Sequence, residues 1–427
     1  MKLTKIAVVC STVVLGALCF SIPAQAKTEV NFWYSGGAKP QQLMKELISE
    51  FNQSQDEYEI KGALQGDYQE TFQKLQAGLA SKTAPTFALV DSITGKTLGS
   101  RGVLRDLRPY LDDEFNFTDF VGAFRRQVTG SDGTVHAIPA YGTTQVLYYN
   151  KQRLADLGFS AENLKTWQGL AAVAAKATQR DAQGNVTFYG WEPMWGNGNL
   201  IDAAFSNGAK AISDDGKKVL IDSPAWIDVF EGFRKWIHDD KIMRIHHGGQ
   251  GWEYWYKTID DVMKERALGY TGSSGDQADL DFTKLAAAPQ PGWGTHPATP
   301  QVGALEFVLP KGSNEKAAKG AFEFIRYYTK AANTARWSML TGYIPVRNSV
   351  TTDPAYKAYT DKNPQALVPL MQASTGTPDF MDPTGGKILD ALAIAADQIE
   401  IENIPAEKAL KQAAKNAQRA LDRSNRP

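Results

Sequence analysis

The chain is nearly free of cysteine, with two in 427 residues. Cys10 and Cys19 both lie in a leading segment that we expect to be removed, so the exported protein is predicted to contain no disulfide and no cysteine-bound metal. A lipid anchor needs a small residue before the modified cysteine, but Val9 and Leu18 stand there. The sequence therefore predicts a soluble protein rather than a tethered one.

The leading segment has the three parts of a secretory signal peptide. Lys2 and Lys5 precede an apolar run from Ile6 to Phe20, and Ala24-Gln25-Ala26 supplies a small-residue cleavage site. The alternative is an uncleaved membrane anchor, but the apolar run is shorter than the roughly 20 residues that span a bilayer. We expect cleavage after Ala26 and export to the periplasm.

Other features are missing beyond residue 26. No hydrophobic run approaches membrane length, and no low-complexity block or fixed-period repeat occurs. The formal net charge of the whole chain is only −1, so nothing suggests nucleic acid or an anionic membrane as a partner. A chain of this length exceeds what one core usually supports, which predicts two lobes.

The motifs of common enzymes are absent as well. The chain has no Gly-x-Ser-x-Gly, no His-Glu-x-x-His and no Gly-x-Gly-x-x-Gly after its first strand. Gly95-Lys96-Thr97 imitates the end of a P-loop, but Val90 stands where that motif has its first glycine. His246-His247 has no nearby cysteine or acidic pair to complete a metal site, which favours an exposed loop. We predict no catalytic residue, no metal and no cofactor.

What the sequence does contain is an alternation of strands and helices after the signal peptide. Apolar runs predict strands at Val30–Tyr34, Tyr58–Leu64 and Thr86–Val90, and apolar spacing predicts helices over 43–51 and 72–79. Strands that alternate with helices imply a mostly parallel sheet, whose ligands lie at the carboxyl ends of the strands. The first candidate site residues follow these strands: Ser35-Gly36-Gly37, Gly66-Asp67-Tyr68 and Asp91-Ser92.

Later parts of the chain supply a second lobe and the connections to it. Helical spacing recurs over 167–177, 225–237, 317–328 and 406–421. Polar, glycine-containing segments at 141–144, 299–303 and 342–346 are the expected crossings between lobes. We predict an α/β fold with a discontinuous chain and hinge crossings, an N-lobe of 27–142 and 303–343, and a C-lobe of 143–302 and 344–427.

Aromatic residues are plentiful, at 11% of the chain with ten tryptophans. A sugar or polyol needs flat rings to stack on and short polar groups that fix its orientation. The rings in polar, glycine-rich surroundings are Trp191, Trp195, Trp252, Tyr254 and Trp255. We expect Trp191 and Trp195 above all to face a ligand. Ser273-Ser274-Gly275 can offer hydroxyl and backbone N–H groups, although the alternative is a polar turn.

Motifs in a fixed order along the chain carry a family resemblance. They are Phe32-Trp33-Tyr34-Ser35, Thr83-Ala84-Pro85, Val146-Leu147-Tyr148-Tyr149-Asn150-Lys151, Thr166-Trp167 and Thr341-Gly342-Tyr343-Ile344-Pro345. The chain resembles the extracellular solute-binding proteins of carbohydrate ABC importers, the group that includes maltose-binding protein. Through Gly66-Asp67-Tyr68-Gln69-Glu70 and Thr271-Gly272-Ser273-Ser274-Gly275 it is most similar to the glycerol-3-phosphate and glycerophosphodiester binders. The resemblance implies a periplasmic-binding-protein-like fold and ABC permease subunits as partners.

The resemblance also implies site residues. It places ligand contacts of the family at Tyr68, Thr143, Ser273, Gly303 and Tyr343, and a tryptophan pair at Trp191 and Trp195. Two positions depart from the family. The acidic contact after the third strand falls on Ser92, beside Asp91, and a late arginine that faces the phosphate falls near Gly385. Without this arginine, a neutral sugar or a zwitterionic glycerophosphodiester competes with glycerol-3-phosphate as the ligand.

The predicted ligand-binding residues are Tyr34, Ser35, Tyr68, Asp91, Ser92, Thr143, Thr144, Trp191, Trp195, Trp252, Ser273, Ser274, Gly303 and Tyr343. We expect a monomer whose lobes close over a small molecule, in a shape that the permease recognises. Two alternatives stay open. A secreted glycoside hydrolase would use a carboxylate such as Asp91 or Glu306, and a ligand-presenting partner of a chemoreceptor would have the same pocket.

Overall fold

The strands of the protein fall into two main sheets. The computed structural model describes residues 26–130 and 132–425, so the predicted signal peptide lies outside the described residues except for Ala26. The first sheet contains β1 (Thr28–Tyr34), β2 (Tyr58–Leu64), β3 (Phe87–Val90), β4 (Ala137–Thr143), β11 (Gln301–Val308) and β12 (Thr377–Pro378). The second contains β5 (Gln145–Asn150), β8 (Glu192–Pro193), β9 (Gly269–Ser273) and β10 (Leu285–Ala288), and a separate pair is formed by β6 (Gln179–Arg180) and β7 (Val186–Phe188).

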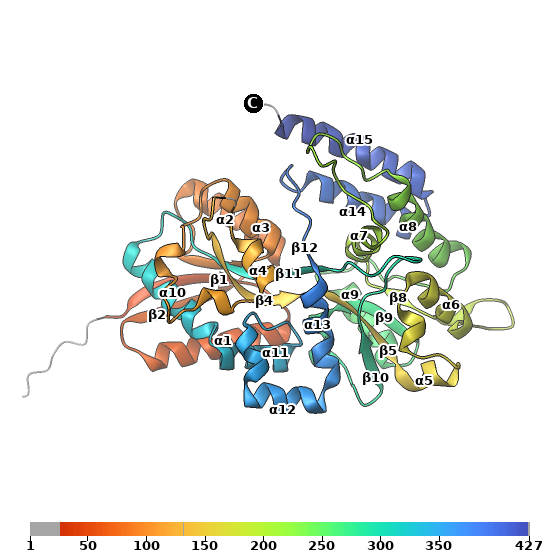
Figure 1. Ribbon diagram of the computed structural model, residues 1–427, viewed down its shortest axis with the longest axis horizontal. Helices are drawn as coiled ribbons and strands as arrows, with labels where there is room; N and C mark the ends of the chain where they lie inside the picture. The colour runs from red at the N-terminus through yellow and green to blue at the C-terminus, as the bar shows by residue number, and fades with distance from the viewer. Residues whose placement is uncertain (1–25, 131, 426–427) are drawn as a thin grey trace, which may run out of the picture.

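Helices surround both sheets. Those near the first sheet are α1 (Ala38–Ser54), α2 (Tyr68–Ser81), α3 (Ser92–Ser100), α4 (Gly122–Val128), α10 (Glu315–Tyr328) and α11 (Ala331–Thr341). Those near the second are α5 (Lys151–Asp156), α6 (Trp167–Ala177), α7 (Asn197–Ser206), α8 (Pro224–Arg234), α9 (Glu253–Met263), α14 (Lys387–Glu400) and α15 (Ala406–Ser424). Figure 1 shows the two groups on opposite sides of the molecule, with α12 (Pro354–Lys362) and α13 (Leu367–Thr375) beneath the junction.

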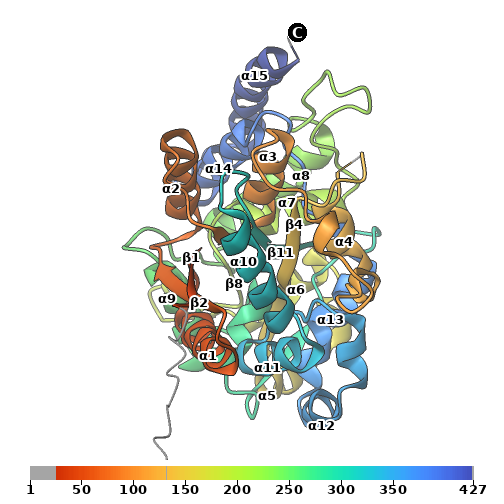
Figure 2. The ribbon, with the colours of Figure 1, turned by 90° about the vertical axis from the view of Figure 1, so that its left-hand side faces the viewer.

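The first sheet has the predicted parallel βαβαβ start. β1 pairs in parallel with both β2 and β3, while β11 runs antiparallel to β3 and β4. Val30, Phe32 and Tyr34 alternate with more exposed residues and form the buried face of β1. The Phe32 ring stacks on Phe87 at 4.1 Å and lies 5.9 Å from Phe324 of α10, which Figure 2 shows across the front of the sheet. The α/β expectation is confirmed.

The second lobe has a core of its own. Trp226, Phe230 and Phe233 of α8 are fully buried, as their helical spacing predicts. The α-helix predicted over 225–237 ends at Arg234, and Lys235–Asp239 continues it as one π-helical turn. In residues 26–130 and 132–425 no helix is both long and apolar enough to cross a membrane.

The chain passes between the lobes at the first two of the three predicted crossings. β4 ends at Thr143 in the first sheet and β5 begins at Gln145 in the second, and the chain returns to the first sheet at β11. The third crossing was predicted at residue 343, which is too early in the chain. Ile344 and Val346 still pack in the first core, and the chain rejoins the second core at Ile388. The other lobe boundaries stay predictions.

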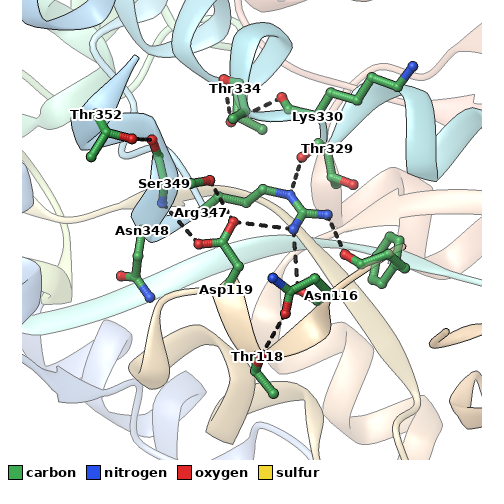
Figure 3. A network of polar contacts seen from close by, with 12 residues as sticks. Asn116, Thr118, Asp119, Thr329, Lys330, Thr334, Arg347, Asn348, Ser349 and Thr352 are labelled. Atoms are coloured by element: carbon green, nitrogen blue, oxygen red, sulfur yellow. Dashed lines mark hydrogen bonds and ion pairs between the residues drawn. The ribbon is translucent and has the colours of Figure 1, made fainter. Parts of the chain in front are cut away.

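Arg347 explains why the chain remains with the first lobe after Tyr343. Its guanidinium donates to the backbone oxygens of Thr329 and Phe115 and lies 3.4 Å from Asp119 Oδ2 (Figure 3). Asp119 in turn accepts hydrogen bonds from the backbone N–H and the hydroxyl of Ser349. This network fastens the segment after the third crossing to loops of the first lobe.

Candidate functional site

A cavity of about 220 Å³ lies where the two lobes face each other. The first lobe lines it with the start of α1, the start of α2, and with Leu305 and Tyr343. Thr143 stands at the crossing. The second lobe contributes residues of α9, the end of β9 and the short helix Ser274–Asp279: Trp252, Trp255, Tyr256, Ser273, Gly275, Asp276, Ala278 and Asp279.

Tyr68 enters the cavity because α2 begins with it. Asp67 caps this helix, its Oδ1 accepting a hydrogen bond from Glu70 N at 2.7 Å. The Tyr68 hydroxyl lies 3.2 Å from that of Tyr141, whose ring centroid is 4.6 Å from that of Tyr343. Burial raises the pKa of Tyr68 to about 12, so its hydroxyl keeps its proton and can donate to a ligand.

Two glycines let Tyr343 lie against the second lobe. Gly342 ends α11 in a left-handed conformation (φ 80°), and a Cβ there would lie 2.5 Å from the backbone oxygen of Ser274. Across the interface, a Cβ at Gly275 would lie 2.3 Å from Cζ of Tyr343. The close contact of the lobes at this edge therefore depends on glycine on both sides.

Short hydroxyl groups meet beside Tyr343. Ser273 Oγ lies 3.3 Å from Thr143 Oγ1, and it accepts a hydrogen bond from Gly275 N at 3.1 Å. The antiparallel pairing of β5 with β9 brings the end of β9 to the crossing, since Ser273 is registered with Gln145. These hydroxyls can donate to or accept from a polar ligand.

The second lobe adds aromatic rings and carboxyl groups. The rings of Trp252 and Trp255 are perpendicular with centroids 5.8 Å apart, and Trp255 Nε1 donates to Asp276 Oδ1 at 2.8 Å. Burial raises the pKa of Asp276 to about 7 and also raises that of Asp279. Lys39, from α1, is the one basic side chain among the described residues that line the cavity.

The structure brings several predicted site residues together. Tyr68, Thr143, Trp252, Ser273 and Tyr343 all line the cavity, where they stay predicted ligand contacts. Trp255, which the sequence analysis selected with less weight, also lines it, as does Asp276.

Trp191 and Trp195 lie elsewhere, contrary to expectation. Trp191 is fully buried in the second core, and its Nε1 donates to Thr271 Oγ1 at 2.9 Å. Trp195 Nε1 donates to Asp397 Oδ1 at 2.8 Å, and its ring meets Tyr254 edge-on. The polar sequence around Trp191 does not indicate its burial, because the burial depends on β8, which directly follows Trp191, pairing with the distant strand β9.

Four more predicted contacts are structural in this conformation. Tyr34 belongs to the buried face of β1, and Ser35 is buried with its Oγ 3.5 Å from Thr71 Oγ1. Thr144 is buried and donates to the backbone oxygen of Gln301. Ser274, the first residue of the short helix Ser274–Asp279, is fully buried and does not line the cavity.

Both candidate hydrolase carboxylates accept hydrogen bonds from neighbouring residues of the fold. Asp91 caps α3, accepting hydrogen bonds from the Thr94 backbone N–H and hydroxyl. Glu306 is fully buried and accepts from Gln127 Nε2. Neither carboxyl group lines the cavity.

His246 lies in a cluster rather than in an exposed loop, although His247 is exposed. Its Nε2 is 2.8 Å from Asp261 Oδ2 and 3.8 Å from Glu192 Oε2, so the fold supplies the acidic pair that the local sequence lacks. The Arg244 guanidinium contacts both carboxylates. The cluster thus already contains a positive charge.

Other lining residues were missed from the sequence. Ala38, Lys39 and Pro40 begin α1, directly after the selected Ser35-Gly36-Gly37, and no side chain caps this helix at Gly37, which also lines the cavity. Tyr256 and Asp279 were missed too. The helical spacing of 252, 255 and 256 could have found Tyr256, because it places these three rings on one face of α9.

The comparisons agree with this geometry. Residues 46–364 match the family described as bacterial extracellular solute-binding protein. The chain belongs to this family. The sn-glycerol-3-phosphate-binding periplasmic protein UgpB of Agrobacterium fabrum is 24% identical over 370 residues, which cover 83% of both chains. The UgpB of Yersinia pestis is 26% identical over 390 residues, 83% of this chain and 82% of the relative.

Solved structures share the fold. UgpB from Mycobacterium tuberculosis in complex with glycerophosphocholine superposes with a TM-score of 0.79 at 22% identity, covering 93% of this chain and 99% of that one. Maltose-bound MalE3 of Thermotoga maritima gives a TM-score of 0.79 at 20% identity, covering 91% and 99%. The protein therefore has the two-lobed fold of maltose-binding-protein-like binding proteins.

Proposed function

We propose that this solute-binding protein takes a neutral or zwitterionic hydroxylated solute, a sugar or a glycerophosphodiester, and delivers it to the permease of an ABC importer outside the cytoplasm. The charge of the cavity carries this proposal. Lys39 lines the cavity together with Asp276 and Asp279, its charge acts on Asp279, and the cavity's other described lining residues add no basic side chain. A dianionic phosphate monoester needs more charge-assisted donors than one lysine supplies. The protein acts as a monomer and binds without catalysis.

The walls of the cavity suit the two ends of such a solute. Trp252 and Trp255 form a perpendicular corner that accepts a sugar ring or a quaternary ammonium group. The uncapped start of α1 and Lys39 offer N–H groups and one positive charge to a phosphodiester. The hydroxyls of Thr143 and Ser273 suit the hydroxylated end.

The names of related proteins support the same solute class. The UgpB relatives are sn-glycerol-3-phosphate-binding proteins, and the two solved structures hold glycerophosphocholine and maltose. All three ligands carry neighbouring hydroxyls, and they differ in charge. The charges of the residues that line the cavity therefore decide which of these three ligands we expect to bind.

A thermal-shift and calorimetry panel tests the proposal with glycerophosphocholine, maltose and glycerol-3-phosphate. We expect glycerophosphocholine or maltose to raise the melting temperature by several degrees and glycerol-3-phosphate to leave it unchanged, because ligand binding stabilises the folded state. Stabilisation by glycerol-3-phosphate alone would contradict the proposal.

One variant pair connects the binding to this cavity. Trp252 is 38% exposed, so Trp252→Ala should leave the melting temperature of the free protein nearly unchanged while weakening binding at least tenfold. Ile394→Ala, which removes an exposed side chain of α14, is the control and should bind as the wild type does. Equal affinities of both variants would place the ligand elsewhere.

A further inference from the structure

Asp379 directly follows β12 and lies next to residues that line the cavity, although it is not one of the lining residues itself. Pairing of β12 with β11 at Gln301 and Val302 brings Asp379 over Gly303, where a Cβ would lie 2.2 Å from Asp379 Oδ2. Gly303 is registered with Thr143 and stands two residues before Leu305, and both of these line the cavity. Since residues two apart on a strand share a face, Asp379 adjoins the cavity.

One oxygen of the Asp379 carboxyl group is fixed and the other is available. Ser92 Oγ donates to Oδ2 at 2.5 Å. No donor among the described side chains and backbone groups makes a hydrogen bond to Oδ1, and the residue keeps part of its surface exposed. A carboxyl group held in this way is ready to accept hydrogen bonds from a ligand.

Acidic groups surround Asp379. Burial and then the charge of Asp91 raise the pKa of Asp379, and Asp379 contributes to the raised pKa values of Asp202 and Glu306. The charge of Lys96 acts on neighbouring Glu306, where it partly opposes the rise in pKa. A phosphate brought to this end of the cavity meets carboxyl groups rather than the arginine that the family resemblance places near Gly385.

We infer that Asp379 determines the specificity of the inner end of the cavity: its free oxygen accepts hydrogen bonds from a diol of the solute, and its charge excludes a phosphate monoester. The family resemblance implies an acidic residue at the position of Ser92. Here Asp379 supplies the carboxyl group from another segment, and the hydroxyl of Ser92 orients it. This inference rests on the proposed function and names the residue that discriminates between its ligands.

Calorimetry on Asp379→Asn and Asp379→Ala tests it, with glycerophosphocholine, maltose and glycerol-3-phosphate as probes. Both variants should bind the wild type's ligand at least tenfold more weakly and glycerol-3-phosphate at least tenfold more tightly. Ser92→Ala should weaken the first ligand about threefold and gain nothing for glycerol-3-phosphate, because the charge remains. Asp214→Asn, at an exposed carboxylate of the second lobe, is the control.

The outcomes separate the two proposals. If the wild type binds glycerophosphocholine or maltose and both Asp379 variants match it within twofold for all three probes, the inference alone is overturned. If the wild type binds only glycerol-3-phosphate, the proposed function and the inference are both overturned. Thermal unfolding of each free variant verifies folding, and we expect no loss of melting temperature for the two Asp379 variants, since each removes a charge from a crowded acidic cluster.

Discussion

At the scale of single residues, buried carboxyl groups shape the junction of the lobes. Burial raises the pKa of Asp202 to about 8, so this residue carries a proton at neutral pH. Its Oδ1 accepts from Gln301 N at 3.1 Å and its Oδ2 lies 2.8 Å from Gln290 Nε2. Deprotonation would leave a charge in this buried position.

Asp202 makes stability depend on pH. Its folded pKa of about 8 lies above the ordinary value of 3.8, so the folded state holds a proton that the unfolded state loses between these values. The stability it contributes is fully present below pH 3.8 and is lost as pH rises through 8. Asp202→Asn mimics the protonated form, so its melting temperature should exceed that of the wild type increasingly from about pH 5 to pH 8.

Scanning calorimetry across this pH range measures the effect. Gln290 Oε1, which has no hydrogen-bond partner in the described part of the chain, can accept from the new amide. Asp214→Asn serves again as the exposed control and should follow the wild type. A difference between Asp202→Asn and the wild type that stays constant with pH would contradict the assignment.

Residue positions were predictable where a motif carried them. Tyr68, Thr143, Ser273 and Tyr343 could be placed from family motifs, and they do meet at one cavity. Trp191 could not, because its burial depends on the pairing of β8 with β9 rather than on its neighbours in sequence. Asp379 was missed for the same reason, since only the contact of β12 with β11 brings it over Gly303.

At the scale of elements, one contact between the two lobes joins the end of α11 to the short helix Ser274–Asp279. The Tyr343 ring lies on Gly275, and Gly342 lies on the backbone of Ser274. These elements come from different lobes, so their contact exists only while the lobes are together. Substitution there should change closure more than folding.

Gly275→Ala tests this contact. A Cβ 2.3 Å from Tyr343 Cζ forces the ring away, so we expect ligand affinity to fall at least tenfold while the melting temperature of the free protein falls by no more than a few degrees. Gly312→Ala is the matched control, since a Cβ there meets nothing within 4 Å. Calorimetry and thermal unfolding of both variants give the two readouts, and unchanged affinity of Gly275→Ala would show that closure tolerates the methyl group.

Elements with strong periodicity were predictable, whereas short ones were not. The alternation in β1 and the helical spacing in α6 and α15 placed these elements nearly to their ends. The two-residue strands β8 and β12 exist only through pairing with strands distant in sequence, so no local pattern could indicate them. The π-helical turn after Arg234 likewise left no signal in the apolar spacing.

At the scale of the whole molecule, two cores meet over one cavity. The two-lobed architecture follows from chain length and the strand–helix alternation, and the first two crossings fall at the predicted segments. The third crossing was misplaced because Arg347 fastens the chain to the first lobe, and this depends on loops far away in sequence.

Closure predicts a measurable change of shape. Because ligand contacts both lobes, its binding should favour the closed form, and the radius of gyration from solution scattering should decrease on adding the solute that stabilises the protein. Gly275→Ala at saturating ligand should show a smaller decrease. An identical scattering curve with and without a verified ligand would contradict closure.

The place of β11 in the first sheet has a consequence for how the chain is made. This strand pairs with β3, β4 and β12, yet it begins at Gln301, after the residues of β5 to β10 have been synthesised. The sheet begun by the N-terminal βαβαβ unit is complete only when β11 and then β12 (Thr377–Pro378) have been made, and such long-range pairing slows folding. The first lobe therefore cannot complete its sheet until most of the second lobe has been made.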